Sequence, residues 1–109
     1  MARQIVDVLS DRQAEDIVLL DISAVASFAD QFVIATATSV RQMDALLDAL
    51  HATLAKDGVH ALHREGTPDS GWVLLDYGDV VVHVFSPEDR AYYDLEGLWS
   101  AGVPLIRIQ

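Results

Sequence analysis

Cysteine is absent from this sequence of 109 residues, basic residues are few, and no apolar run is long. Without cysteine the chain can form no disulfide, no thiolate metal site and no thiol nucleophile, which suits a reducing cytoplasm. No apolar run reaches the roughly 18 residues of a membrane span. Met1 to Asp16 alternates charged with apolar residues, unlike a signal peptide. We therefore expect a soluble, unprocessed cytoplasmic protein with no membrane partner.

The scarcity of basic residues argues against nucleic-acid binding. Seven Lys and Arg stand against 17 Asp and Glu, which gives a net charge of −10 at pH 7. A groove for a nucleic-acid backbone needs clustered basic side chains, whereas here they are scattered singly. The stretch from Glu65 to Glu96 holds eight acidic residues and one basic residue. This charge predicts little direct binding to RNA and favours a basic protein partner, or serves solubility alone.

Length and hydropathy patterning predict one α/β domain with enough apolar residues, 51%, for a core. Helical spacing, a capping box that starts at Ser39, a stop at Gly58 and an N-cap at Ser86 mark the helices. Gly78 marks the turn of a β-hairpin. The expected elements, within a single domain of residues 1–109, are helices over 2–13, 39–58 and 86–99, strands at 17–20, 32–35 and near His60, and a hairpin that joins 72–75 to 80–85. Residues 103–108 are either an edge strand or loose.

The hairpin presents two different faces. Alternation along the strands places only aliphatic side chains on one face, which we expect in the core. The other face mixes apolar, aromatic and acidic side chains, and on it His83 is expected to be a hydrogen-bonded structural histidine rather than a metal ligand. The core face consists of Val73, Leu75, Val80, Val82 and Val84, and the mixed face of Trp72, Leu74, Asp76, Asp79, Val81, His83 and Phe85.

Catalytic and cofactor motifs are missing. The sequence has no phosphate loop, no G-x-G-x-x-G, no G-x-S-x-G and no H-E-x-x-H. His60 and His63, with Glu65, could bind zinc only if a turn brought both imidazoles together, because residues three apart on an extended segment point to opposite faces. No D-x-D pair offers two carboxylates on one strand face, which argues against metal-dependent nucleotidyl transfer. We expect no metal, no cofactor and no enzymatic activity.

Aromatic residues concentrate in the same part of the chain as the negative charge. Rings amid carboxylates can form a protein-binding surface, in which the rings anchor a basic partner and the acids steer it. For Phe85, Tyr92 and Trp99 we expect a place in the core, and for Trp72 and Tyr77 core and surface stay open. Six of the eight aromatic residues fall in this region: Trp72, Tyr77, Phe85, Tyr92, Tyr93 and Trp99.

Two long motifs give the chain a family resemblance. Trp72 to Phe85 reads W-x-L-L-D-Y-G-D-x-V-V-H-x-F, and Arg90 to Trp99 reads R-x-Y-Y-x-L-E-x-L-W. Together with Ala29–Thr36, Ser39–Gln42 and Glu65–Gly66, in order along nearly the whole chain, these runs resemble the ribosome silencing factor (RsfS, Iojap-like) family. One departure is Gln31, where the family usually has an aromatic residue.

The resemblance implies a fold and a function. The implied fold is a mixed β-sheet of about five strands with helices, of nucleotidyltransferase-like topology without the catalytic carboxylates. Family members bind the large ribosomal subunit through ribosomal protein uL-fourteen and sterically block association with the small subunit when nutrients are short. Several self-associate as homodimers off the ribosome. The alternatives are a nucleotidyltransferase-like enzyme and a dimeric structural adaptor.

The same resemblance assigns candidate binding residues to the hairpin and the segment before it. Trp72 and Leu74 are expected to be desolvated anchors, and the acidic residues are expected to pair with Arg or Lys of the partner. The candidate partner-binding residues are Glu65, Trp72, Leu74, Asp76, Tyr77 and Asp79.

Overall fold

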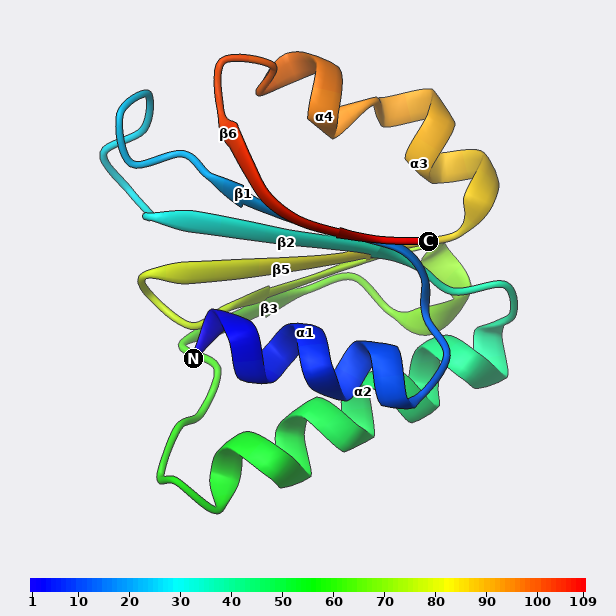
Figure 1. The fold of residues 1–109 in the computed structure, drawn as a ribbon. Helices are drawn as coiled ribbons and strands as arrows, with labels where there is room; N and C mark the ends of the chain where they lie inside the picture. The colour runs from blue at the N-terminus through cyan, green and yellow to red at the C-terminus, as the bar shows by residue number, and fades with distance from the viewer.

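A six-stranded mixed sheet separates two layers of helices in the computed structural model, which describes residues 1–109. Figure 1 shows α1 and α2 on one face of the sheet and α3 and α4 on the other. In chain order the elements are α1 (Ala2–Asp11), β1 (Glu15–Asp21), β2 (Gln31–Thr36), α2 (Val40–Ala55), β3 (His63–Glu65), a 3₁₀ turn (Pro68–Ser70), β4 (Trp72–Asp76), β5 (Val80–Phe85), α3 (Pro87–Tyr93), α4 (Leu95–Leu98) and β6 (Val103–Ile108). None of these helices is both long and apolar enough to cross a membrane.

The strand order is β3-β4-β5-β2-β1-β6. β2 and β5 run parallel at the centre, and every other neighbouring pair is antiparallel. The α/β class is confirmed, as is the hairpin of β4 with β5, in which Gly78 takes a φ of +90°. The sheet has six strands rather than about five, because residues 103–108 pair with β1 as an edge strand.

The two faces of the sheet are covered to different degrees. The expected core face of the hairpin is confirmed: its five aliphatic residues are buried beneath α1 and α2, in the larger apolar cluster. On the other face a smaller cluster gathers around Phe32, Phe85 and Leu95 under α3 and α4. Because α3 and α4 are short, they leave part of this second face accessible to solvent.

The start and end of α2 follow from its sequence. Ser39 Oγ accepts from the backbone N–H of Gln42 at 3.0 Å, as the capping box predicts. The Gln42 side chain accepts from the backbone N–H of Thr38 at 2.8 Å, one residue before the donor that a capping box uses. After the helix, Gly58 has the left-handed φ of +74° that the predicted stop requires.

The last predicted helix is broken in two, which corrects the expectation of one helix to Trp99. Asp94 has a φ of +43° and caps both pieces: its N–H bonds to the Arg90 carbonyl at the end of α3, and its carboxylate accepts from Gly97 N at 3.2 Å at the start of α4. Tyr92, near the end of α3, is 80% exposed, so its expected place in the core is wrong. Phe85 is fully buried as expected.

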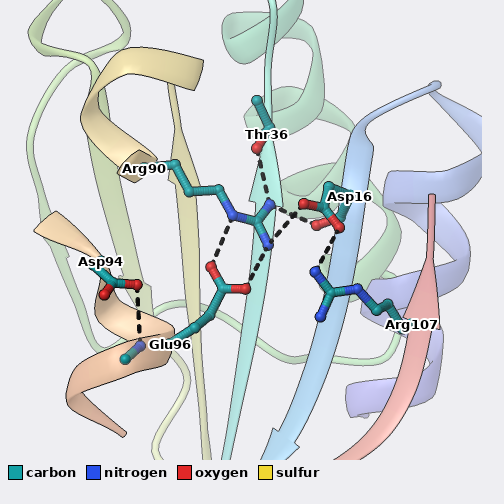
Figure 2. Close-up of polar contacts among 7 residues, drawn as sticks. Asp16, Thr36, Arg90, Asp94, Glu96 and Arg107 are labelled. Carbon is teal, nitrogen blue, oxygen red and sulfur yellow. Dashed lines mark hydrogen bonds and ion pairs between the residues drawn. The ribbon is translucent and has the colours of Figure 1, made fainter. Parts of the chain in front are cut away.

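A buried guanidinium attaches α3 and α4 to the sheet (Figure 2). Arg90, with a side chain only 9% exposed, donates to both carboxylate oxygens of Glu96, at 2.9 and 3.2 Å. It also donates to Thr36 Oγ1 at 2.9 Å and to the Asp16 carbonyl. The Asp16 carboxylate lies 3.7 Å from Arg90 and 3.2 Å from Arg107 of β6. One side chain therefore ties two helices to β1 and β2.

We predict that Arg90→Met lowers the free energy of unfolding by about 3 kcal/mol, because it leaves the partly buried Glu96 without its partner. Arg107→Met is the matched control: it removes another guanidinium from Asp16, but that side chain is 51% exposed. Its cost is expected to stay within about 1 kcal/mol. Urea unfolding at pH 7 measures both, and equal losses would contradict a special role for Arg90.

Candidate partner-binding surface

Three of the six candidate residues meet at the β3–β4 end of the sheet. Glu65 of β3 pairs in register with Leu74 of β4, and Trp72 lies two residues before Leu74 on the same face. With Gly66 they line a shallow pocket of about 250 Å³, called here the β4 pocket. Glu65 is exposed, whereas Trp72 and Leu74 are half-buried. An apolar floor with a carboxylate at its rim can accept an aliphatic stem that ends in a positive charge.

The hairpin turn places the other three candidates differently. The Asp76 carboxylate accepts from the Gly78 backbone N–H at 2.7 Å and so stabilises the turn. The Asp79 side chain is exposed, free to meet a partner. Tyr77 is 8% exposed and packs in the larger core, and this burial raises the pKa of its hydroxyl. Tyr77, which the sequence left open between core and surface, is therefore a core residue.

Aromatic contacts and one hydrogen bond hold Trp72 in place. Its ring stacks on Phe85 with centroids 4.9 Å apart and planes 29° apart, and Tyr93 of α3 lies against it at 4.6 Å. Its indole Nε1 donates to Nδ1 of His83 on β5 at 3.2 Å. Trp72 thus has one well-determined position, although part of its ring faces solvent.

His83 is the hydrogen-bonded histidine that the sequence predicts. It is 3% exposed, and the Phe32 ring meets it edge-on with centroids 4.7 Å apart. Burial lowers the pKa of His83 to about 4, so it is neutral at pH 7. Since Nδ1 accepts from Trp72, the ring proton is on Nε2, which is buried without a partner. Burying the unpaired Nε2–H costs about 1–3 kcal/mol, whereas an ordinary hydrogen bond contributes about 0.5–1.5 kcal/mol. The hydrogen bond between Trp72 and His83 therefore adds little net stability to the fold.

Exposed aromatic side chains lie beside the β4 pocket and, separately, near the start of β2, and the sequence did not reveal all of them. Tyr93, 48% exposed, contacts Trp72 and continues to Tyr92 at 5.0 Å. Phe28, 60% exposed, packs on Trp99 at 5.7 Å. No periodicity marks Phe28, which precedes β2 in an irregular loop.

Two other regions of the surface lack the side chains that a phosphate or a metal ion needs. A pocket of about 360 Å³ lies at the carboxyl ends of the parallel strands β2 and β5, where α/β proteins often bind ligands. Its lining includes Asp69, Glu88 and Asp89 and no basic residue for a phosphate. Elsewhere, His63 Nε2 lies 3.3 Å from Glu65, but no three His, Asp or Glu side chains are grouped to hold a metal ion.

Comparisons with known proteins identify the family. A family model described as "Ribosomal silencing factor during starvation" (RsfS) matches residues 1–109. The chain belongs to the RsfS family. The ribosomal silencing factor RsfS of Chromobacterium violaceum is 40% identical over 91% of this chain and 81% of its own length. The corresponding protein of Bacillus subtilis is 40% identical over 83% of this chain and 76% of its own.

Plant relatives and solved structures extend the RsfS similarity. The chloroplastic protein Iojap of Zea mays is 35% identical over 88% of this chain and 42% of its own length. A crystal structure of a Chromobacterium violaceum protein matches with a TM-score of 0.86 at 39% identity, covering 91% of this chain and 82% of that one. One from Bacillus halodurans matches with a TM-score of 0.83 at 34% identity, covering 96% and 95%. The resemblance seen in the sequence is thereby confirmed.

The burial of His83 predicts a pH dependence of stability in this RsfS chain. A folded-state pKa of about 4 against 6.5 means that, as pH falls below 6.5, the unfolded chain takes up a proton that the folded chain refuses. The contribution of neutral His83 to the free energy of unfolding is therefore fully present above pH 6.5 and is lost as pH falls toward 4. When pH is lowered from 7.5 to 5.5, the free energy of unfolding of the unaltered protein should fall by about 1 kcal/mol more than that of the His83→Asn variant. Urea unfolding measures this difference, and parallel pH profiles would contradict it.

Proposed function

We propose that this chain binds the large ribosomal subunit through ribosomal protein uL-fourteen and sterically blocks association with the small subunit. In doing so it represses translation when nutrients are limiting, and it acts in the cytoplasm. The observation that carries the proposal is the β4 pocket with its rim: an apolar floor, a carboxylate edge and adjoining exposed rings, in a chain whose relatives are named silencing factors.

The chemistry of this surface favours a basic protein over RNA. Trp72 and Leu74 offer apolar area for anchors that lose their water on binding, and such central anchors dominate interface energies. Glu65 and Asp79 supply exposed negative charge that steers a basic partner and pairs with its Arg or Lys side chains. The net charge of −10 repels phosphates, so the surface suits a basic ribosomal protein and disfavours direct contact with rRNA.

The proposed mechanism needs no chemistry. A folded domain with extents of 33 × 33 × 24 Å would occupy space that the small subunit requires when it joins. No bond is made or broken, so the chain is proposed to act without a cofactor and without catalysis. The alternative of a nucleotidyltransferase-like enzyme finds little support, because the pocket at the ends of β2 and β5 has acidic lining and no basic residue for a nucleotide's phosphates.

We predict that Glu65→Lys with Asp79→Lys weakens binding to isolated large subunits by well over tenfold, because two interfacial charge pairs become repulsive. Both side chains are exposed, and the one ion-pair contact between them and the rest of the fold is that of Glu65 with the exposed His63, so the variant should remain folded. Asp76 is left unchanged because its carboxylate stabilises the hairpin turn. Co-sedimentation or a direct Kd measurement with purified subunits gives the result.

The matched control is Asp11→Lys with Asp44→Lys, which changes the net charge equally on exposed sites of α1 and α2, across the sheet. Its affinity should change by less than about threefold, since exposed charges distant from an interface are screened. If the control weakens binding as much as the test variant, total charge rather than this surface controls binding. Unchanged binding by both would place the interface elsewhere.

We also propose that the chain forms a homodimer off the ribosome, and here a dimeric structural adaptor is the alternative. If the dimer and the ribosome use the same surface, a monomeric variant that keeps the binding residues should bind subunits more tightly. The adaptor alternative predicts that such a variant binds with lost or unchanged affinity. Sedimentation velocity to establish the monomer, followed by subunit binding, separates the two.

A further inference from the structure

We propose that His83 is a positioning residue: through its hydrogen bond it sets the orientation in which Trp72 meets a basic protein partner. This inference rests on the proposed function, because it assumes that Trp72 is an anchor of the interface. His83 is only 3% exposed, so it cannot contact a partner directly and can affect binding only through Trp72. The contact that links them is the 3.2 Å bond from Trp72 Nε1 to His83 Nδ1.

Ring stacking alone leaves the orientation of Trp72 open. Phe85 and Tyr93 pack against the indole at 4.9 and 4.6 Å and fix the plane of the ring. The terminal sp³–sp² torsion of a Trp side chain has broad, roughly two-fold preferences, so contacts on the ring faces define its orientation less sharply than a hydrogen bond at one edge does. A hydrogen bond to Nε1 distinguishes the two edges. It directs the N–H to His83, and the same residue, Trp72, lines the β4 pocket.

Its neighbours fix the His83 imidazole where its Nδ1 can accept from the Trp72 indole. In the β4–β5 register it faces Leu74, and Trp72 faces Phe85, so His83 and Trp72 are diagonal neighbours on one face of the hairpin. Phe32 meets the imidazole edge-on at 4.7 Å from the adjoining strand β2. Burial keeps the imidazole neutral at pH 7, which leaves Nδ1 able to accept.

A contribution to folding stability does not explain why Trp72 and His83 are paired. Their bond is offset by the buried Nε2–H, which has no acceptor, and an apolar side chain at this position would carry no such cost. A residue that contributes little to folding yet fixes an anchor at the candidate surface fits a role in pre-organising the interface. The distinguishing signature is therefore a loss of binding without a matching loss of stability.

The test compares His83→Leu, which removes the acceptor, with His83→Asn, whose side-chain oxygen can occupy the Nδ1 position. In ¹⁵N-resolved NMR spectra at pH 7, the Trp72 indole N–H should move upfield and exchange with D₂O at least about tenfold faster in His83→Leu. The Trp99 indole serves as the internal reference. Affinity for isolated large subunits should fall by about fivefold, the cost of ordering one side chain on binding, while the urea midpoint is kept. His83→Asn should restore both readouts.

Two further variants keep the inference falsifiable. If His83→Leu fails to fold, His83→Gln, whose oxygen lies one bond farther out, should show the same spectral change and the same loss of affinity. In a Trp72→Phe background, His83→Leu should cause no additional loss, because His83 acts through the indole N–H. An unchanged Trp72 resonance, unchanged affinity, or an equal loss in the Trp72→Phe background would each overturn the positioning role.

The outcomes also separate this inference from the proposed function. If the unaltered protein does not bind large subunits, the proposed function fails, and the Trp72 resonance alone then decides whether His83 orients the indole. If the unaltered protein binds and His83→Leu binds equally well with a freed indole, the proposed function stands and the positioning role is overturned.

Discussion

The guanidinium of Arg90 is the contact on which the second face of the sheet depends. It joins Glu96 of α4 to Thr36 of β2 and to the Asp16 carbonyl, and so holds a thin helical layer against the strands. That layer carries Tyr93 onto Trp72. We expect that loss of these contacts would loosen the packing of Tyr93 against Trp72 beside the β4 pocket. A buried ion pair thus helps to fix the position of groups that it does not touch.

The two faces of the sheet differ in how completely helices cover them. Two amphipathic helices seal the first face, and the aliphatic side of the hairpin is fully buried there. On the second face, short helices cover the centre and leave aromatic side chains and carboxylates in contact with water at one end. Exposed aromatic side chains that lie side by side, such as Tyr92 and Tyr93, are a common feature of protein-binding surfaces. Under the proposed function, the negative charge of this region would favour a basic partner.

Much of the fold follows from local sequence patterns, and most of the site does not. The capping residue Ser39 and the alternation along the hairpin predict α2 and the buried face of the sheet, because these are local effects. The break at Asp94 was missed because the apolar spacing continues through it while the backbone turns left-handed. The contact of Arg90 with the Asp16 carbonyl spans 74 residues, and the bond from Trp72 to His83 depends on a register that the sequence shows only as a shared face.

A reconstruction of the protein bound to the large ribosomal subunit tests the central claim most directly, since it measures which face meets the partner. The account predicts that the β4 pocket, with Trp72 and Leu74, lies against uL-fourteen, and that the body of the domain overlaps the position of the small subunit. A complex in which α1 and α2 face the subunit, or in which the domain leaves the joining surface free, would contradict it.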